Sequence, residues 1–413
     1  MTIAVHTLGC KVNRCDTENL VSRLVGLGFG LCDFCDKADV YIINTCTVTQ
    51  TSDKKSLQMI RRARKLNPSA YVAVCGCLVL KEVPNGFPAD FVFDARSPDD
   101  FLHKLKSLSV SEPVDMKPVM SRTRSFIKIQ DGCKQYCSYC IVPYARGPSI
   151  SRDKNDIINE AKNLVSRGTK EIVLTGINTS SYNSGGSFAC LVKDVLSIDG
   201  LIRLRLSSID PVAVDSVFLD IIANFDNLCP HFHLSLQSGS NEILNKMNRK
   251  YSAEDYFIAV NRIREILPNA AITTDVMVGF PGESEQCFFD TYSLAQAVGF
   301  SDMHIFEYSK REGTPAAVFD GQVPAEVKKQ RSNRLRSLAG NMRASYLEKQ
   351  VGKTLQVLFE NDQESGFFRG LSREYVRTVV YSKEPLFNKV MDVKITGIAT
   401  PKKTNDLIGV AIL

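Results

Sequence analysis

Three cysteines share one short segment, DGCKQYCSYC, in which Cys133, Cys137 and Cys140 have the spacing C-x3-C-x2-C. A disulfide uses two cysteines, whereas a structural zinc ion takes four ligands. Three thiolates suit a four-iron cluster better, because the iron that lacks a protein ligand stays open to a small molecule. The candidates for a fourth zinc ligand are distant in the sequence: Cys190, Cys229 and Cys287.

An open iron position in a low-potential cluster indicates one-electron reduction of a bound molecule. S-adenosylmethionine can occupy such a position, and its reductive cleavage yields a carbon radical. In chemistry of this kind the cofactors carry the difficult step, while the protein orients and shields them. We therefore predict that the three cysteines hold a [4Fe-4S] cluster that binds S-adenosylmethionine. A zinc site is the alternative.

Three further cysteines occupy equivalent places in the first part of the chain. Apolar runs typical of buried parallel strands cover residues 3–8, 39–44 and 70–75. A cysteine follows each run: Cys10, Cys46 and Cys77. Gly9 and Gly76 directly precede two of them and allow the backbone to turn tightly. Because the carboxyl ends of parallel strands share one edge of a sheet, we expect these cysteines to meet in space rather than to be unrelated core thiols.

At 413 residues the chain is too long for one ordinary domain, and its pattern changes along its length. Residues 1–120 alternate strands with helices, which predicts an open parallel α/β domain. Residues 121–344 predict a partial (β/α)6 barrel with its chemistry at the carboxyl ends of the strands. The expected barrel strands cover residues 125–130, 171–176, 201–207, 231–236, 271–279 and 302–309. Short alternating runs in residues 345–413 predict a small all-β barrel.

The composition favours a cytoplasmic protein. No apolar run reaches the roughly 18 residues that a membrane span needs, and the first residues lack the charged start and apolar core of a secretion signal. In the cytosol the 13 cysteines are kept reduced, which favours metal binding or catalysis over disulfides. A net charge of +6 permits binding to nucleic acid without requiring it.

Several short motifs extend the signal of the three-cysteine segment across almost the whole chain. They read LGCKVN, INTCTV, QDGCKQYCSYCIVPYARG, VLTGIN, RLSSIDP, HLSLQSGS, MNRKY, TTDVMVGFPGE and REGTPAA. Together they resemble the radical S-adenosylmethionine methylthiotransferase family, and the last domain resembles the TRAM module of that family. LGCKVN and CSYCIVPYARG are similar to the branch that acts on N6-threonylcarbamoyladenosine in tRNA. Branches that act on isopentenyladenosine in tRNA or on a ribosomal protein side chain are the alternatives.

The resemblance also implies site residues. A second [4Fe-4S] cluster is expected at Cys10, Cys46 and Cys77, whereas two extra thiols, Cys15 and Cys75, match no ligand position of the family. The central domain is then a radical S-adenosylmethionine core. Contacts to the cofactor are expected from loop and strand-end residues: Tyr139, Thr175, Gly176, Ser207 and Gln237. The alternative for Tyr139 is plain loop packing, and for Thr175 and Gly176 it is a glycine that simply ends the strand.

Substrate and partners follow from the same resemblance. It implies that sulfur is inserted into a C–H bond of adenosine in the tRNA anticodon loop and is then methylated. An electron donor such as flavodoxin or ferredoxin is implied, and the sulfur donor stays unknown. Basic helical stretches at residues 53–65 and 328–343 are candidates for phosphate contact or are simply solvated faces. A non-catalytic, zinc-stabilised RNA-binding protein is the remote alternative.

Overall fold

The computed structural model describes the chain except for residues 82, 84–86, 109–122, 365, 400–405 and 412–413. The described chain divides into two compact units. The first contains residues 1–120, 131–150 and 309–318, and the second contains residues 121–130, 151–308 and 319–413. The division into domains 1–120, 121–344 and 345–413 stays a prediction, and its first border lies outside the described residues. Within the described residues, no helix combines the length and apolar character needed to cross a membrane.

The first unit is built on a parallel sheet with the strand order β2-β1-β3-β4-β5. Its strands are β1 (Thr2–Thr7), β2 (Gly30–Cys32), β3 (Val40–Thr45), β4 (Tyr71–Gly76) and β5 (Phe91–Val92). Its helices are α1 (Lys11–Gly26), α2 (Gln50–Leu66), α3 (Cys77–Lys81), α4 (Asp99–Leu108) and α5 (Val142–Arg146).

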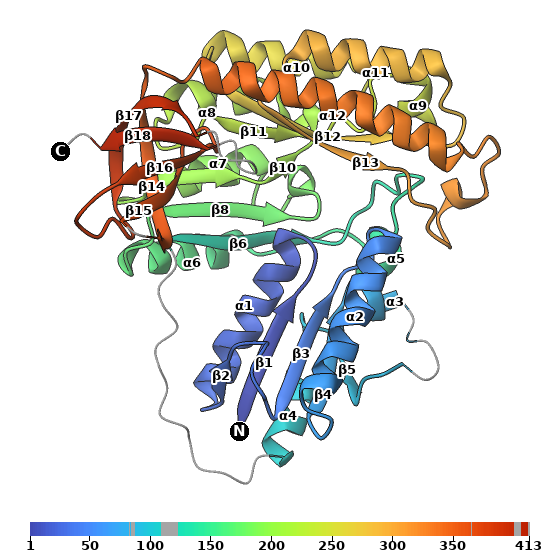
Figure 1. Ribbon diagram of the computed structural model, residues 1–413, viewed down its shortest axis with the longest axis vertical. Coiled ribbons are helices and arrows are strands. Elements are labelled where there is room, and N and C mark those ends of the chain that lie inside the picture. Colours follow the sequence, from blue (N-terminus) through green and yellow to red (C-terminus); the bar gives the residue numbers. More distant parts are fainter. Residues whose placement is uncertain (82, 84–86, 109–122, 365, 400–405, 412–413) are drawn as a thin grey trace. The chain divides into compact units, whose positions relative to one another are not determined.

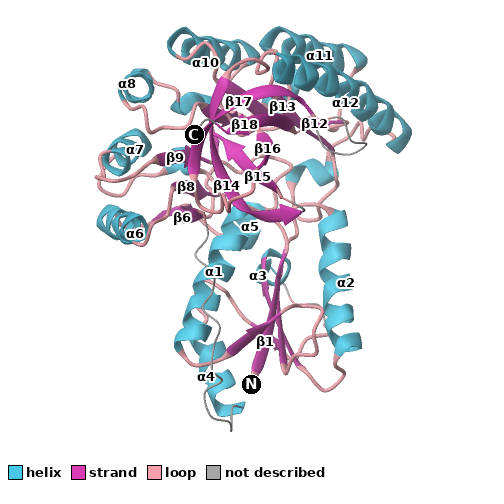
Figure 2. Cartoon of the chain, turned by 60° about the vertical axis from the view of Figure 1, so that its left-hand side comes forward, coloured by secondary structure: helices cyan, strands magenta, loops and turns pink. Residues whose placement is uncertain are grey.

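Helices cover both faces of this sheet, and α1 and α2 lie on opposite sides of it (Figure 2). Leu24 of α1 and Phe101 of α4 pack with Ile42 in one hydrophobic cluster, while Ile60 of α2 packs with Ile43 in another. Neighbouring residues of β3 therefore face different clusters, so the whole strand is buried. The predicted open parallel α/β domain is confirmed.

The second unit contains the central barrel. One parallel sheet holds β6 (Arg124–Asp131), β8 (Glu171–Gly176) and β9 (Arg203–Leu206), with β7 (Ile150–Ser151) at its edge. The other holds β10 (Ser208–Ile209), β11 (His231–Leu234), β12 (Ala271–Val278) and β13 (Asp302–Glu307), all parallel. The Leu204 N–H donates to the Asn227 carbonyl at 2.8 Å, which connects β9 to the segment before β11. The predicted partial barrel is confirmed.

Helices alternate with these strands and complete the barrel. They are α6 (Lys154–Ser166), α7 (Phe188–Leu196), α8 (Ser216–Asn224), α9 (Asn241–Lys246), α10 (Ala253–Ile266) and α11 (Glu285–Val298). Apolar side chains from strands and helices form one continuous core, for example Leu174 of β8, Leu191 of α7 and Val260 of α10. A long helix, α12 (Ala325–Glu348), packs through Leu335 and Leu338 on the same core and leads to the last domain.

The last domain is a closed β-barrel with the strand order β14-β15-β16-β18-β17. Its strands are β14 (Thr354–Glu364), β15 (Phe367–Ser372), β16 (Arg377–Tyr381), β17 (Val390–Ile398) and β18 (Leu407–Ala411). Val357, Phe368 and Val393 fill its core. Closure pairs strands that would otherwise be exposed edges. The predicted TRAM-like barrel is confirmed.

The small barrel lies beside the starts of the central strands (Figure 1), and a buried ionic network fixes it there. Arg205 of β9 pairs with Glu171 of β8 at 2.7 Å, and both side chains are almost completely buried. The Arg205 guanidinium also donates to the carbonyls of Ser372 and Arg373, at 3.1 and 2.9 Å, in the β15–β16 hairpin. Its neighbour Arg203 donates to the Leu371 carbonyl at 3.2 Å. The hairpin is thus held at the opposite end of the central strands from their carboxyl ends.

Candidate functional site

The structure brings together the three cysteines that follow strands of the first unit. Cys10 lies between β1 and α1, Cys46 directly follows β3, and Cys77 begins α3 after β4. A Cβ atom placed on Gly9 would lie 2.9 Å from the Cys46 Cβ and 3.0 Å from its Sγ, so the Gly9–Cys10 backbone passes directly over Cys46. Cys10 and Cys46 are also close enough to Cys77 to raise its pKa through electrostatic repulsion. Parallel pairing therefore gathers the three thiols at one sheet edge.

Two glycines permit this close approach. Gly9 has φ +97° and Gly76 has φ +89°, in the left-handed region that a side chain disfavours. A Cβ on Gly76 would lie 2.3 Å from the Asn44 Oδ1, which leaves no space for any side chain. The two predicted tight turns are therefore present, and each is crowded by the loop that carries another cysteine.

Asparagine side chains hold the cysteine loops in place. Asn13 donates to the carbonyls of Leu8 and Thr45, both at 2.8 Å, and so joins the ends of β1 and β3. Asn44 donates to the Asn13 carbonyl at 2.9 Å and to the Thr17 hydroxyl at 2.9 Å. The sequence analysis did not assign a role to either residue, although both stand inside the quoted motifs LGCKVN and INTCTV.

Arg146 is a buried residue that the sequence analysis also missed. Only 4% of it is exposed, at the end of α5. Its Nε donates to the Cys77 Sγ at 3.3 Å, its Nη1 donates to both Asp131 oxygens at 2.8 and 2.9 Å, and its Nη2 donates to Asn13 Oδ1 at 2.5 Å and Asp16 Oδ2 at 3.0 Å. Burial opposes the charge of Arg146, but Cys77, Asp131 and Asp16 outweigh it and raise the arginine pKa.

Burial changes the pKa of two of the gathered thiols, Cys46 and Cys77. It raises the pKa of Cys46, and it raises the pKa of Cys77 to about 11 although the Arg146 charge acts in the opposite direction. Both groups are therefore neutral thiols at pH 7 in the absence of a metal, and a metal must displace their protons. The extra thiol Cys75 is fully buried in a hydrophobic cluster, where burial raises its pKa well above the ordinary value. Cys15 is buried on α1.

The three-cysteine segment lies between β6 and α5 and folds back on itself. The Cys133 N–H donates to the Gly147 carbonyl at 3.1 Å, and the Cys140 N–H donates to the Cys137 carbonyl at 2.9 Å. Cys133 and Cys137 are buried, whereas Cys140 and Tyr139 are partly exposed. The Ala316 N–H donates to the Ser138 carbonyl at 2.8 Å, so the REGTPAA motif packs on this segment.

The geometry of the thiols bears on the kind of metal they fit. Within the part of the chain that the structure describes, no three His, Cys, Asp or Glu side chains converge on a point that would suit a single metal ion. A four-iron cluster does not need such convergence, because each thiolate binds a different iron. Two sets of three cysteines, each on closely held loops, fit that kind of group. The three candidates for a fourth zinc ligand, Cys190, Cys229 and Cys287, lie in the second unit.

The other predicted cofactor contacts lie where central strands end. Thr175 and Gly176 end β8, Ser207 directly follows β9, and Gln237 lies beyond β11. Ser207 Oγ is buried and has no hydrogen-bond partner among the described residues, which is typical of a group that a ligand completes. Gln237 has φ +65°, a strained backbone held by a hydrogen bond from its N–H to the Asp275 carbonyl at 2.9 Å. Tyr139, by contrast, belongs to the first unit.

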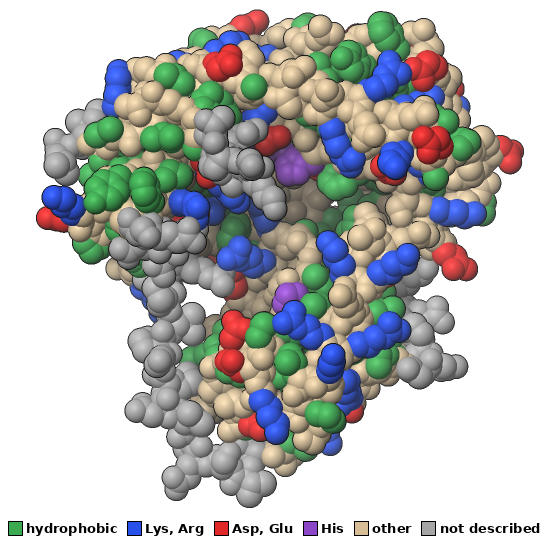
Figure 3. All heavy atoms as spheres, viewed as in Figure 1, with side chains coloured by type: hydrophobic (Ala, Val, Ile, Leu, Met, Phe, Trp, Pro, Cys, Tyr) green, Lys and Arg blue, Asp and Glu red, His purple; other side chains and the backbone are tan. Residues whose placement is uncertain are grey.

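The two basic helical stretches differ in what their charges do. On α2, most Lys and Arg side chains are exposed: Lys54, Lys55, Arg61, Arg62 and Lys65. Figure 3 shows several blue Lys and Arg side chains on the face of the first unit over which α2 lies. On α12, Arg331 is buried against Glu283 at 2.7 Å, and Arg334 pairs with Glu285 at 2.5 Å. The α2 stretch is therefore a solvated basic face, whereas part of the α12 stretch holds the second unit together.

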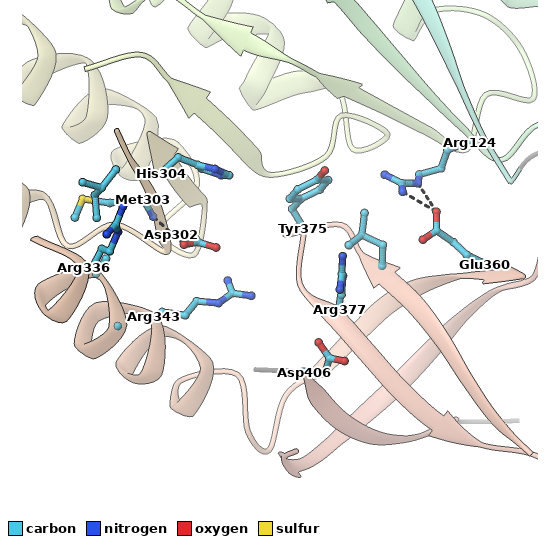
Figure 4. A pocket seen from close by; sticks show the side chains of 14 residues that line it. Arg124, Asp302, Met303, His304, Arg336, Arg343, Glu360, Tyr375, Arg377 and Asp406 are labelled. Carbon is cyan, nitrogen blue, oxygen red and sulfur yellow. Dashed lines mark hydrogen bonds and ion pairs between the residues drawn. The ribbon is translucent and has the colours of Figure 1, made fainter. Parts of the chain in front are cut away.

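A hollow of about 610 Å³ in the second unit lies between α12, β13 and the small barrel (Figure 4). Its arginines are Arg124, Arg336, Arg343 and Arg377, and its acidic residues are Asp302, Glu360 and Asp406. Arg124 pairs with Glu360 at 2.6 Å. Arg336 and Arg343 of α12 extend toward the hollow from one side, and Arg377 of β16 does so from the other. The arrangement offers several guanidinium groups to an anionic ligand, with acidic residues between them.

Aromatic residues of the small barrel separate into two groups. Phe368 is buried in the barrel core. Phe367 and Tyr381 face each other across β15 and β16, are 50% and 60% exposed, and form an edge-to-face pair with ring centroids 5.4 Å apart. The two groups arise because alternate residues of a strand point to opposite sides of the sheet.

Comparisons with known proteins cover both units. Residues 127–295 match the Radical SAM superfamily, and residues 2–90 match the Uncharacterized protein family UPF0004. The chain is 36% identical to the threonylcarbamoyladenosine tRNA methylthiotransferase MtaB of Bacillus subtilis (strain 168), over 99% of this chain and 97% of that protein. It is 38% identical to the protein of the same name from Aquifex aeolicus (strain VF5), over 87% and 92%. It is 36% identical to the tRNA-2-methylthio-N(6)-dimethylallyladenosine synthase of Clostridium novyi (strain NT), over 98% and 96%.

Solved structures share the fold at low sequence identity. The radical S-adenosylmethionine methyltransferase TsrM from Kitasatospora setae matches with a TM-score of 0.56 and 16% identity, over 77% of this chain and 75% of that chain. The cobalamin-dependent radical enzyme OxsB matches with a TM-score of 0.51 and 12% identity, over 81% and 55%. At these identities the likeness concerns the fold alone.

Proposed function

The chain belongs to the radical S-adenosylmethionine methylthiotransferase family, and from this premise we propose that it converts N6-threonylcarbamoyladenosine beside the tRNA anticodon into the 2-methylthio derivative. The observation that carries the proposal is the pair of three-cysteine sets in a chain that matches such an enzyme almost end to end. The relatives named for dimethylallyladenosine are 34–36% identical, whereas those named for threonylcarbamoyladenosine are 36–38% identical. The motifs LGCKVN and CSYCIVPYARG also favour the threonylcarbamoyl substrate.

We assign the cysteines to two [4Fe-4S] clusters. Cys133, Cys137 and Cys140 hold the cluster that serves S-adenosylmethionine, and the set at the sheet edge holds the auxiliary cluster: Cys10, Cys46 and Cys77. When bound, these groups supply an electron for radical formation and a site for the sulfur to be inserted. The protein contributes hydrogen bonds that fix the cysteine-bearing backbone, and it buries four of the six proposed ligands: Cys46, Cys77, Cys133 and Cys137.

The strand ends of the central barrel orient S-adenosylmethionine in this proposal. Ser207 Oγ, buried and unpartnered among the described residues, offers a hydrogen bond to a polar group of the cofactor. The backbone of Thr175 and Gly176 takes the methionine amino group, Gln237 takes a ribose or carboxylate oxygen, and Tyr139 flanks the adenine. Backbone and short side chains suit this task, because they position the cofactor without blocking its approach.

The tRNA meets the protein through several positively charged and aromatic features. The exposed face of α2 and the arginines of the hollow in Figure 4 contact phosphates, which makes binding sensitive to salt. The exposed pair Phe367 and Tyr381 stacks on bases of a single-stranded loop. Such a loop can present its adenine outside a stack, the usual basis of specific RNA recognition.

The reaction also needs partners from the cell. Reduction of the cluster requires a one-electron donor, for which a flavodoxin or a ferredoxin is suitable, and a sulfur donor must restore the inserted sulfur. We place the protein in the cytoplasm, where these donors and mature tRNA are found together.

Nucleoside mass spectrometry of tRNA tests the proposal. A strain that lacks the gene should lose 2-methylthio-N6-threonylcarbamoyladenosine and regain it with the gene. It should not regain it with a variant in which Cys133, Cys137 and Cys140 are alanine. If the isopentenyl derivative responds instead, or if a ribosomal protein changes mass, the substrate assignment is wrong.

A further inference from the structure

We propose that Arg146 is a positioning residue that ties the Cys10–Cys46–Cys77 site to the three-cysteine segment and tunes the auxiliary cluster through its hydrogen bond to Cys77. The proposal deepens the proposed function and rests on the assignment of the auxiliary cluster to these cysteines. Nothing in the family comparisons assigns this residue a role. Its contacts all lie within the first unit.

Every side chain that Arg146 contacts is close in sequence to a cysteine. Asn13 and Asp16 follow Cys10 at the start of α1, Cys77 is itself a proposed ligand, and Asp131 lies two residues before Cys133. One guanidinium therefore connects three segments that the sequence keeps far apart. A displacement of Asp131 would therefore be transmitted to Cys77 through the rigid guanidinium group of Arg146.

The arginine is also anchored through its backbone. The Arg146 carbonyl accepts a hydrogen bond from the Arg96 Nη1 at 2.8 Å, and the next carbonyl, that of Gly147, accepts from the Cys133 N–H at 3.1 Å. The side chain thus binds Cys77 and Asp131, while the backbone of the next residue binds Cys133. The residue acts on both cysteine sets at once.

Lysine cannot reproduce these contacts. A guanidinium presents five N–H donors in a planar fork, whereas an ammonium is a single point with three donors. Arg146 uses Nε, Nη1 and Nη2 toward three different segments, with distances of 2.5–3.3 Å. Arg146→Lys keeps the positive charge and loses the fork, which separates geometry from charge.

The contact to Cys77 gives the arginine a specific effect on the cluster. Hydrogen bonds to the sulfurs of an iron–sulfur cluster, together with nearby charge and solvent exposure, set its reduction potential. A donor on the ligand sulfur stabilises the reduced, more negative state. We expect the auxiliary cluster to shift to a lower potential when this N–H donor is lost.

The experiment isolates the auxiliary cluster in the full-length chain. The parent carries Cys133→Ala, Cys137→Ala and Cys140→Ala, so that its remaining cluster reports on Cys10, Cys46 and Cys77. Arg146→Lys is added to this parent, and iron content, the electron paramagnetic resonance spectrum and the midpoint potential are measured anaerobically. Arg205→Lys is the matched control, because Arg205 is equally buried and ion-paired but contacts none of the proposed ligands.

We expect Arg146→Lys to lower the midpoint potential and change the spectrum, and Arg205→Lys to change neither. A second variant, Asp131→Asn, covers the case in which Arg146→Lys fails to fold. Asp131 accepts hydrogen bonds from Arg146 on both carboxylate oxygens, so the coupling predicts a changed spectrum of the auxiliary cluster in this variant too.

The outcomes are distinguishable. Suppose that the parent holds a cluster, and that neither Arg146→Lys nor Asp131→Asn changes its potential or spectrum. This result would overturn the role of Arg146 and leave the proposed function intact. A folded parent that holds no iron would contradict the assignment of the auxiliary cluster, and the proposal would fall with it.

Discussion

Two buried hydrogen-bond networks, one in each compact unit, are each centred on an arginine but have different roles. Arg146 in the first unit faces a thiol, an amide and two carboxylates at the ends of α1, α3 and β6. Arg205 in the second unit faces one carboxylate and the carbonyls of a hairpin. The first network surrounds the proposed cluster ligands, whereas the second joins two domains.

The partners explain the difference. Carbonyls of a hairpin bind an arginine through backbone geometry, so the Arg205 network depends largely on the backbone of the small barrel, with Tyr375 and Gln356 as its side-chain partners there. The Arg146 network depends on particular side chains, and a change in any one of them reaches Cys77. We infer that the second network sets how firmly the small barrel is held, and that the first sets the properties of the proposed auxiliary cluster.

Removing Glu171 should have the largest effect on stability. Glu171→Ala leaves the buried charges of Arg203 and Arg205 without their carboxylate, which costs about 3–5 kcal/mol in comparable buried pairs. Urea unfolding should show this loss, whereas the spectrum of the auxiliary cluster should not change in protein that remains folded. Unchanged unfolding would mean that the network does not hold the domains together.

The same carboxylate should make the network sensitive to acid. Burial by itself raises the pKa of Glu171, but Arg205, Arg124 and Arg203 outweigh it, and the folded-state pKa lies below the ordinary 4.5. The stabilisation is therefore complete above pH 4.5 and is lost as the pH falls through the lower folded-state value. Glu171→Gln should unfold with a shallower acid dependence than the parent, and equal slopes would contradict the assignment.

Arg146→Lys should have the second largest effect, this time on activity. Removing an outer-shell partner of a metal ligand typically costs 10–100-fold in activity or metal affinity, so we expect about that loss in 2-methylthio product per enzyme. Thermal unfolding of the cluster-free protein provides the control for stability. A variant with full activity would show that the fork of hydrogen bonds is not needed.

The exposed aromatic pair, Phe367 and Tyr381, tests whether the small barrel that the Arg205 network holds in place binds RNA. Phe367→Ala and Tyr381→Ala should each weaken tRNA binding by about 1–3 kcal/mol if a base stacks there, with no change in unfolding. Binding should be measured at two salt concentrations, because the stacking part resists salt while the phosphate part does not. Phe368→Ala is the matched control from the core side of the same strand, and it should lower stability first.

Cys75→Ser should have the smallest effect of these substitutions on stability and cluster content, and it tests how far the Arg146 network extends. The serine hydroxyl replaces a thiol in a hydrophobic cluster, at a cost of about 1 kcal/mol in unfolding free energy. Both clusters should remain, as judged by iron content. Loss of one cluster would make Cys75 a ligand and reverse the choice of Cys77.

Much of the fold could be predicted because its signals are local. Strands such as β4 are continuous apolar runs, and α10 (Ala253–Ile266) follows an N-cap serine, Ser252, that forms a capping box with Asp255. The helix α7 was not predicted, because Phe188–Leu196 is a short apolar stretch in which a strand and a buried helix look alike. The gathering of Cys10, Cys46 and Cys77 could be predicted because parallel strands run in the same direction, so their carboxyl ends lie at one edge of the sheet.

The supporting residues of the site could not be predicted in this way. Arg146 is 133 residues from Asn13 and 130 from Asp16, and no local pattern joins positions so far apart. Arg203 and Arg205 did carry a signal, since two charges at alternate positions inside the apolar run LIRLRLS need buried partners. The partner of Arg205 in the hairpin is backbone, which a sequence pattern does not identify.

The order of strands in the small barrel has a consequence for synthesis of the chain. β18 pairs in parallel with β16 and antiparallel with β17, so it closes the barrel between two strands that are made earlier. Until the ribosome has released Leu407–Ala411, these two strands keep open edges that invite pairing with other nascent chains. A truncation before Leu407 should therefore aggregate during translation, although it retains every proposed cysteine ligand.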